Sequence, residues 1–377
     1  MTKKLLFLLL SMATYQVALA QTDAQPHRRP HFRRMAFATD TVMVHDPVMA
    51  YESIPTGGRN SKSQGTYFLL STGMGLQWAT SQDRKTWVVQ PTPFIEHLPE
   101  WTYDSVPGFR GHVWAPDLIR WHDRWWLTYS CSTFGKNTSA IGLMSSNRLN
   151  GEWRDEGCLV KSEANRDDWN AIDSNISIDD NDRPWLVWGS FWDGIQIVPL
   201  TVNSEQFTVN SEQLTVNSET KTIARRYAKG DPNAAENPTS KFAGRNSIEA
   251  PFIFQKNGWY YLFVSWDYCC RGAKSNYRVA VGRSKKIDGP YLDRDGKDML
   301  VGGGTLLFAD DHSPYGRLQG ERKEYEAAGH CAVYTIPTPD GTEEDVFICH
   351  GYSATKDGAA LLIQRTIKWT SDGWPTL

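Results

Sequence analysis

The sequence predicts an all-β protein folded as a five-bladed β-propeller. An aromatic-rich segment occurs five times along the 377 residues, and an apolar segment follows each copy. Gly, Asn and Asp separate these short segments, and helical periodicity is absent. Repeated antiparallel units of this kind are typical of propellers, in which each repeat forms one blade. A two-sheet sandwich is the alternative, but it would not require the same strand sequence five times.

The first element of the repeat is an aromatic strand that ends in a small or polar residue. Its copies begin at residues 66, 124, 183, 259 and 345, so they lie 58, 59, 76 and 86 residues apart. In order, they read TYFLLST, RWWLTYS, RPWLVWGS, WYYLFVS and DVFICHGYS. The apolar strands that follow them read MGLQWATS, SAIGLMSS, DGIQIVPL, YRVAVGRS and AALLIQRT. The two longer intervals contain insertions.

Three parts are expected along the chain. Residues 1–20 read as a signal peptide, with Lys3 and Lys4 before an apolar run and Ala18-Leu19-Ala20 as the cleavage site. Residues 21–40 are basic and read as a flexible leader. Residues 41–377 form the propeller. The protein is therefore expected to be secreted or periplasmic, and the absence of a cysteine near the cleavage site argues against a lipid anchor.

One insertion is a tandem repeat, TVNSEQF-TVNSEQL-TVNSET, at residues 201–220. Its period of seven suggests a coiled coil, but its apolar residues step by five and two, so no a/d seam exists. The repeat is better interpreted as a surface loop or an extended ribbon in the third blade, without a role in function.

The composition excludes some partners and favours one. The 40 basic and 43 acidic residues nearly balance, which gives no electrostatic case for nucleic acid or a membrane surface. The 16 Trp and 15 Tyr suit a carbohydrate ligand, because sugars stack on flat rings, although strands also favour aromatic residues. We expect a monomer with a carbohydrate substrate.

Six cysteines remain after signal cleavage: Cys131, Cys158, Cys269, Cys270, Cys331 and Cys349. Their spacing matches no zinc motif, since Cys269 and Cys270 are adjacent. An exported protein can form disulfides, but a chain of this size does not need them, and we expect buried free thiols.

A polar or ionisable residue opens the innermost strand of each predicted blade. Because the innermost strands line the central channel, these residues should converge at one end of it. They are Asp46, Asp117, Asp173, Glu249 and His330. Gathered carboxylates raise one another's pKa values, so some should hold a proton near neutral pH. Glycosidases use such a pair, with a protonated acid beside an ionised carboxylate.

These residues lie in motifs that resemble glycoside hydrolase family 43, and within it the arabinan endo-1,5-α-L-arabinosidases. The resemblance covers residues 42 to 374. The motifs that carry it are His45-Asp46-Pro47, Trp114-Ala115-Pro116-Asp117, Ala171-Ile172-Asp173-Ser174-Asn175, Ile248-Glu249-Ala250-Pro251, Asp267-Tyr268-Cys269-Cys270-Arg271-Gly272 and Gly302-Gly303-Gly304-Thr305. The resemblance implies a five-bladed propeller that hydrolyses internal α-1,5-L-arabinofuranosyl linkages of arabinan or arabino-oligosaccharides.

The resemblance also implies roles for the carboxylates. Asp46 would be the general base that activates water, and Glu249 the general acid. Asp173 would raise the pKa of the acid and orient it. Inversion requires the base and the acid to lie about 6.5–9.5 Å apart, which leaves room for the water.

Further residues are assigned in the same way. His330 is similar to a histidine that contacts a bound calcium ion in related arabinanases. One imidazole is a thin calcium site, and Cys331 stands where many relatives have Asn, so a neutral hydrogen-bonded His330 is the alternative. Substrate contacts are expected from Trp114, Asp117, Ser132, Phe134, Asn175 and Trp188.

Three alternatives remain open. An exo-acting α-L-arabinofuranosidase or β-xylosidase of the same family would carry the same carboxylates. A non-catalytic carbohydrate-binding propeller would use the aromatic residues but would not need Asp46, Asp173 and Glu249 together. A levansucrase-like transferase fits the motifs around Glu249 and Cys269 less well.

Overall fold

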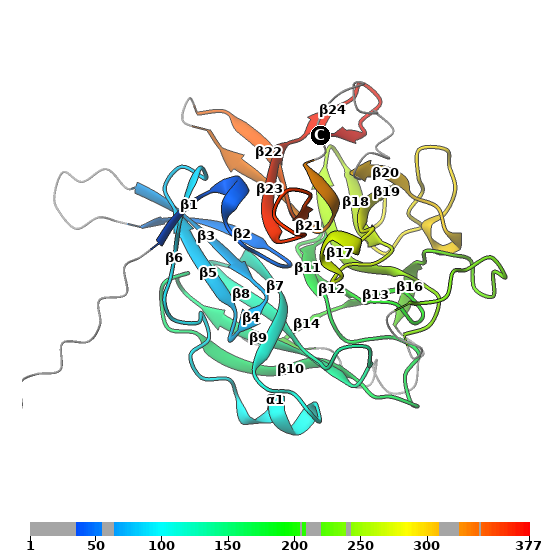
Figure 1. Cartoon of the computed structure of the whole chain (residues 1–377), viewed down its shortest axis with the longest axis horizontal. Helices are drawn as coiled ribbons and strands as arrows, with labels where there is room; N and C mark the ends of the chain where they lie inside the picture. Colours follow the sequence, from blue (N-terminus) through cyan, green and yellow to red (C-terminus); the bar gives the residue numbers. More distant parts are fainter. Residues whose placement is uncertain are drawn as a thin grey trace, which may run out of the picture. The chain divides into compact units, whose positions relative to one another are not determined.

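Five antiparallel sheets surround a common axis in the computed structural model, as the repeat predicted (Figure 1). The structure describes residues 35–54, 64–203, 206–208, 220–238, 243–308, 324–338 and 341–377. The expected signal peptide therefore lies outside the described residues. In Figure 1 the strands β2, β7, β11, β17 and β21 gather around the centre, each as the innermost strand of its blade.

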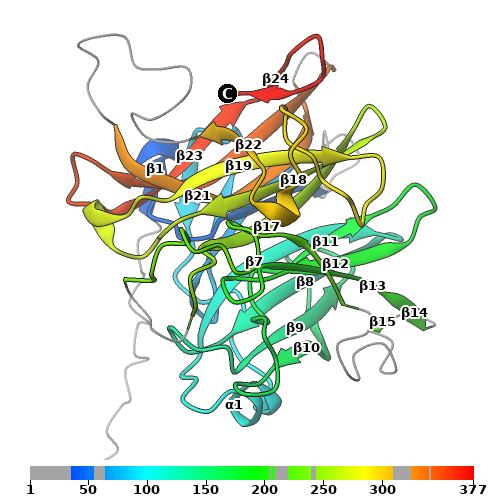
Figure 2. The ribbon, with the colours of Figure 1, turned by 90° about the vertical axis from the view of Figure 1, so that its right-hand side faces the viewer.

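The strands of each blade follow one another outward from the axis (Figure 2). Blade one contains β2 (Val48–Ile54), β3 (Gln64–Ser71), β5 (Gln77–Ser81), β6 (Thr86–Val89) and β1 (Met35–Ala38). Blade two contains β7 (His112–Trp121), β8 (Arg124–Cys131), β9 (Ser139–Ser146) and β10 (Arg154–Ser162), with β4 (Gly73–Met74) on the inner edge. Blade three contains β11 (Asn175–Ile178), β12 (Pro184–Trp188), β13 (Ile195–Pro199) and β16 (Lys221–Ala224). Blade four contains β17 (Ile248–Lys256), β18 (Trp259–Trp266), β19 (Arg278–Ser284) and β20 (Thr305–Phe308). Blade five contains β21 (Tyr325–Pro337), β22 (Glu343–Ser353) and β23 (Ala360–Thr366).

A few short elements complete the described residues. The hairpins are β14 (Thr201–Asn203) with β15 (Gln206–Thr208), and β24 (Lys368–Trp369) with β25 (Pro375–Thr376). The first hairpin lies in the tandem repeat, between β13 and β16 of blade three, and residues 204–205 and 209–219 of that repeat lie outside the described residues. The helices are α1 (Glu100–Ser105), η1 (Thr39–Thr41), η2 (Gly272–Lys274) and η3 (Met299–Val301). None of the helices in the described part of the chain is long and apolar enough to cross a membrane.

The apolar core lies between neighbouring blades. Leu70 of blade one and Leu127 of blade two belong to one buried cluster. Leu143 and Leu186 join blades two and three in the same way. A sheet that is covered on both faces needs apolar residues on both faces, which explains why β8, β9 and β18 are apolar without alternation.

The ring closes through the N-terminal part of the described chain. The Val44 amide donates to the Ala360 carbonyl at 3.2 Å, and the Leu362 amide donates to the Val42 carbonyl at 3.1 Å. This segment thus continues blade five beyond β23. The preceding residues are also ordered, because β1 pairs with β6. Part of the segment expected to be a leader thus belongs to blade one, since Phe37 packs against the core between the blades.

A residue in the left-handed conformation lies within the innermost strand of each blade or two residues before it. The five residues and their φ angles are Asp46 (53°), Ala115 (44°), Asp173 (58°), Ala250 (54°) and His330 (53°). Residues other than glycine adopt such angles at a cost of roughly 1–3 kcal/mol each, so the surroundings must hold them.

In four of the five blades, a side chain of the aromatic strand in the preceding blade accepts a hydrogen bond from the amide of this residue, whereas in blade four the Ala250 amide bonds to the Asp173 carboxyl group. The pairs are Ala115 N to Thr72 Oγ1 (2.9 Å), Asp173 N to Ser130 Oγ (3.0 Å), His330 N to Ser265 Oγ (2.8 Å) and Asp46 N to His350 Nδ1 (3.1 Å). The acceptors are the polar residues at or near the end of the aromatic strands. The repeated sequence therefore joins each blade to the next.

Substitution of Ser265 by Ala should show what one such contact contributes. The buried His330 amide would lose its acceptor, so we expect the free energy of unfolding to fall by roughly 1–3 kcal/mol. Urea denaturation measures the change. Ser284→Ala is the control, because the Ser284 hydroxyl accepts an amide within its own turn, from Lys286. An equal loss in both variants would contradict a special role for the contact between blades.

Candidate active site

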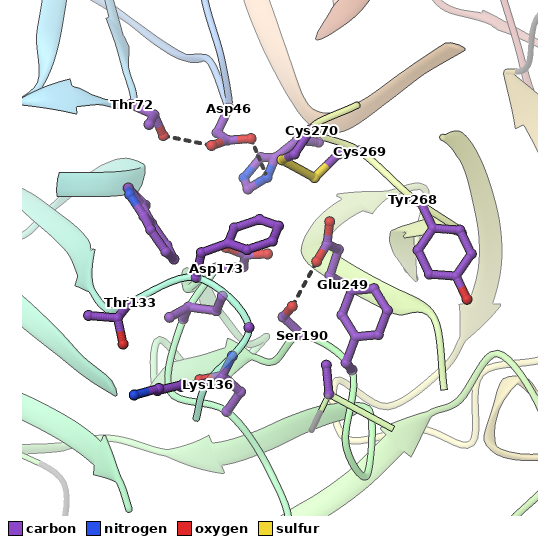
Figure 3. A pocket seen from close by; sticks show the side chains of 18 of the residues that line it. Asp46, Thr72, Thr133, Lys136, Asp173, Ser190, Glu249, Tyr268, Cys269 and Cys270 are labelled. Carbon is purple, nitrogen blue, oxygen red and sulfur yellow. Dashed lines mark hydrogen bonds and ion pairs between the residues drawn. A yellow bond between two sulfur atoms is a disulfide. The ribbon is translucent and has the colours of Figure 1, made fainter. Parts of the chain in front are cut away.

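Side chains from all five blades line one cavity of about 550 Å³ (Figure 3). Asp46, Asp173, Glu249 and His330 are among them, so four of the five residues that open the predicted strands do meet. The left-handed residues show which positions in the different blades are equivalent. Asp46, Asp173 and His330 are equivalent, whereas Glu249 precedes the left-handed Ala250 by one residue.

Asp46 is surrounded by donors. Its Oδ2 accepts the Thr72 hydroxyl at 2.6 Å and lies 2.9 Å from His45 Nδ1. Its Oδ1 lies 3.1 Å from His330 Nδ1. Burial alone would raise the pKa of Asp46, but the charges and hydrogen bonds of His45 and His330 hold this pKa well below its ordinary value. Asp46 is therefore an ionised carboxylate.

His330 supplies the opposing charge. Burial alone would lower its pKa, but the carboxylates of Asp46, Asp173 and Glu249 raise it to about 9. His330 is therefore an imidazolium at neutral pH, which disfavours the alternative of a neutral imidazole.

Glu249 and Asp173 behave differently from Asp46. Burial raises the pKa of Glu249, although Ser190, whose Oγ donates to Glu249 Oε2 at 2.7 Å, opposes the shift. Burial also raises the pKa of Asp173 well above its ordinary value, and the charge of Glu249 adds to this shift while His330 opposes it. The cavity thus combines an ionised carboxylate with two carboxyl groups that retain protons more readily.

Asp117 and Asn175 do not line the cavity. Asp117 Oδ2 accepts hydrogen bonds from Asn175 Nδ2 and from the Ile176 amide, both at 3.1 Å. Asn175 Oδ1 accepts the Ile253 amide at 3.0 Å. Burial raises the pKa of Asp117 to about 6. Asp117 lies two residues beyond the left-handed Ala115, and the pair joins blades two, three and four. The assignment of both residues to substrate binding is therefore withdrawn.

Of the other four residues expected to contact the substrate, two line the cavity and two do not. Trp114 and Phe134 line the cavity, and Phe134 is exposed. Ser132 and Trp188 are buried and do not line it. The Ser132 hydroxyl bonds to Ser139 at 2.7 Å, and the Trp188 ring packs against Trp169 inside the blade, so neither faces a ligand.

Comparison with known proteins agrees with this geometry. The sequence profile described as glycosyl hydrolases family 43 matches residues 59–375. The chain belongs to glycosyl hydrolase family 43. It is 36% identical to an extracellular exo-α-(1→5)-L-arabinofuranosidase of Cellvibrio japonicus, over 90% of this chain and 88% of that protein. It is 33% identical to an extracellular endo-α-(1→5)-L-arabinanase of Bacillus subtilis, over 98% and 97%.

Solved structures of arabinanases are similar in fold as well. An exo-1,5-α-L-arabinanase from a bovine ruminal metagenomic library is 42% identical, with a TM-score of 0.73, over 91% of this chain and 99% of that one. A Cellvibrio cellulosa α-L-arabinanase complexed with arabinohexaose is 35% identical, with a TM-score of 0.71, over 89% and 95%. The chain is therefore a glycosidase with the fold of the arabinanases.

This family 43 cavity has aromatic walls that sequence reasoning missed. Phe191, Trp192 and Tyr268 line it together with Trp114 and Phe134. Phe191 and Trp192 have φ angles of 57° and 38°, which are rare for bulky residues. The Phe191 amide donates to the Ile248 carbonyl at 2.8 Å and so holds this turn in place. The feature of the sequence that could have revealed them is the aromatic pair Phe191-Trp192, which follows β12 of blade three.

The cysteines differ from the expectation in part. Cys131, Cys331 and Cys349 are buried free thiols, as predicted, and Cys158 is free but exposed. The prediction was wrong for Cys269 and Cys270, which form a disulfide with each other.

His45, Asp46 and His350 form the cluster nearest to a metal site among the described residues. One ligand atom from each lies within 4.8 Å of the others. Calcium prefers six to eight oxygen ligands, whereas this cluster offers two imidazoles and one carboxylate. His350 Nδ1 also accepts the Asp46 amide already. This cluster is therefore a poor calcium site and does not include His330, so the calcium ion expected beside His330 stays a prediction.

His330→Gln should move the pH dependence of hydrolysis. Burial opposes the low pKa of Asp46, and His330 helps to maintain it, so removing the imidazolium raises this pKa. The pKa of Glu249 rises too, because His330 lowers it. Both limbs of the kcat/KM profile should shift to higher pH. His122→Gln, a change to an exposed histidine paired with Asp182, is the control. An acid limb that stays in place in His330→Gln would contradict the assignment.

Proposed function

We propose that this protein hydrolyses internal α-1,5-L-arabinofuranosyl linkages of arabinan and arabino-oligosaccharides with inversion of configuration. The observation that carries the proposal is that two carboxyl groups in one cavity have their pKa values shifted in opposite directions. Asp46 is held ionised by His45 and His330 against the effect of burial, while burial favours the protonated form of Glu249. An inverting glycosidase needs this combination.

In the proposed reaction, Asp46 is the general base. Its carboxylate accepts a proton from a water molecule as the water oxygen attacks the anomeric carbon. The Thr72 hydroxyl and the His45 and His330 imidazoles hold the carboxylate in one orientation. The attack comes from the face opposite the leaving group, so the configuration inverts.

Glu249 is the proposed general acid. It donates its proton to the oxygen of the departing arabinosyl unit as the glycosidic bond breaks. Ser190 holds its Oε2 and so directs the carboxyl group. Asp173 is the proposed third carboxyl, because the charge of Glu249 helps to raise the pKa of Asp173, and two such neighbouring groups disfavour ionisation of one another. Afterwards, solvent returns a proton to Glu249 and removes one from Asp46.

The walls of the cavity support a furanose substrate. Five aromatic residues line it, namely Trp114, Phe134, Phe191, Trp192 and Tyr268. Flat rings stack against the apolar faces of sugars. The relatives are named for α-1,5-linked arabinose, and one related structure contains arabinohexaose, which supports the same substrate for this chain.

Exo action on the same substrate is the second candidate. It is favoured by the names of two relatives that are 36% and 42% identical to this chain. Endo action is favoured by the Bacillus relative, which matches 98% of this chain.

We also propose that the protein is secreted, since two relatives are named extracellular. The proposed reaction includes no calcium ion, because the cluster of His45, Asp46 and His350 is poor in the oxygen ligands that calcium prefers.

Asp46→Asn and Glu249→Gln should each lower kcat on linear arabinan by at least about a thousandfold. Each variant keeps the shape of the side chain but loses the proton transfer. Binding of arabinohexaose, measured by calorimetry, should survive in both variants. If either variant remained active, its assignment would be wrong. If the wild type bound the sugar without hydrolysing it, the carbohydrate-binding alternative would replace the enzyme.

The products distinguish the two candidates. With linear 1,5-α-arabinan, endo action should give intermediate oligosaccharides early, as measured by chromatography. Release of arabinose alone from the start would establish exo action. Proton NMR of the first product should show the β-anomer before mutarotation, and an α-anomer would contradict inversion.

A further inference from the structure

Two adjacent cysteines form a disulfide in the wall of the cavity near Asp46. Cys269 and Cys270 both line the cavity (Figure 3). Cys270 is exposed and has a φ of 64°, a left-handed conformation that cysteine rarely adopts. A disulfide between neighbours closes almost no loop, so it removes little entropy from the unfolded chain. Global stability therefore does not explain this disulfide.

Other contacts fix the loop without the disulfide. Asp267 accepts a hydrogen bond from Arg278 Nε at 2.7 Å. The Tyr268 amide donates to Asn276 Oδ1, and the Asn276 amide donates to the Tyr268 carbonyl, both at 3.1 Å. What the disulfide adds is local, because it restrains the peptide between the two cysteines and thus the direction of the Cys270 N–H.

A chain of hydrogen bonds leads from this N–H to Asp46. The Cys270 amide donates to the Tyr352 hydroxyl at 2.7 Å, and this hydroxyl lies 2.8 Å from His45 Nε2. His45 Nδ1 lies 2.9 Å from Asp46 Oδ2. The Tyr352 hydroxyl and the His350 ring are buried beneath the cavity wall.

When His45 is neutral, it acts on Asp46 as a hydrogen-bond donor and not as a charge, and the contacts are satisfied with its proton on Nδ1. The Tyr352 oxygen accepts the Cys270 N–H, and its own proton can then go to His45 Nε2, which also lies 3.8 Å from Cys270 Sγ. The remaining proton of His45 is then on Nδ1 and faces Asp46. His350 agrees with this arrangement, because its Nδ1 accepts the Asp46 amide and its Nε2 can therefore donate to the Tyr352 oxygen, 3.3 Å away.

We propose that the Cys269–Cys270 disulfide, acting through Tyr352 and His45, positions the general base Asp46. The inference rests on the function proposed above for Asp46. The small ring closed by the disulfide keeps the backbone of Cys270 in the left-handed conformation, and the Cys270 amide orients the Tyr352 hydroxyl. The hydroxyl keeps the proton of His45 on the nitrogen that faces the base. In the reduced loop Cys270 is free to leave this conformation, and His45 can then present a lone pair to the Asp46 carboxylate.

Reduction tests the role of the disulfide in the unchanged enzyme. Tris(2-carboxyethyl)phosphine and one water convert the disulfide into two thiols and a phosphine oxide, and the other four cysteines are already free. With arabino-oligosaccharides, kcat should fall roughly 5- to 50-fold and recover on reoxidation, while KM stays within about twofold. The variant Cys269→Ser/Cys270→Ser should start at the reduced level and not respond to the phosphine. Cys158→Ser, the control, should respond as the wild type does.

Tyr352→Phe interrupts the series of hydrogen bonds between Cys270 and Asp46 and leaves the disulfide in place. We expect a loss of kcat of the same order. Nitrogen-15 NMR of the histidines should also show that His45 loses its Nδ1–H form. Tyr334→Phe is the matched control. The Tyr334 hydroxyl also accepts a hydrogen bond from an amide of another blade, that of Met49 at 3.1 Å, but it is not part of the series of hydrogen bonds that leads to Asp46.

The outcomes separate this inference from the proposed function. A kcat that resists the phosphine, or a change in KM alone, would overturn the positioning role. An unchanged His45 signal in Tyr352→Phe would overturn it as well. If the oxidised wild type did not hydrolyse arabinan at all, the proposed function itself would fail.

Discussion

The active site depends on one contact that is repeated between the blades. A residue in a costly left-handed conformation lies within each innermost strand or two residues before it, and in four blades its amide is held by a side chain of the aromatic strand in the blade before. Because the left-handed turn redirects the chain at the cavity, the contact joins the blades and aims the side chains at the same time. The carboxylates are thus positioned by the contact that also assembles the ring.

The blade that departs from this pattern carries the proposed acid. Ser190 corresponds to Thr72, Ser130 and Ser265, but its hydroxyl donates to the Glu249 carboxyl group instead of accepting the next amide. One position of the repeat has thereby changed from a structural contact to a contact with a catalytic side chain. His330, the only opener with a positive charge, offsets part of the repulsion among the carboxylates and favours ionisation of Asp46 over Glu249.

The repeat made much of this predictable. Blade number, strand order and the meeting of Asp46, Asp173, Glu249 and His330 follow from five similar segments. Asp117 looks the same in sequence, but the bulge between Trp114 and Asp117 shifts it two residues past the turn and into the axis. A sequence pattern predicts where a strand lies, but it does not reveal a bulge, and the bulge changes the position of a residue within the strand. Phe191, Trp192 and the adjacent cysteines lie in turns outside the repeat, so no second copy revealed their position.

The segment that closes the ring also places Asp46, the proposed general base. The Val44 amide pairs with Ala360 of blade five, and Asp46 follows only two residues later. Its other contacts come from His350 and His330, also in blade five, and from Thr72 in blade one. Glu249 is held by blades three and four. The separation of base and acid is therefore set by how blades one and five meet blade four around the axis. Opening of the ring would displace the base before it disturbed the acid.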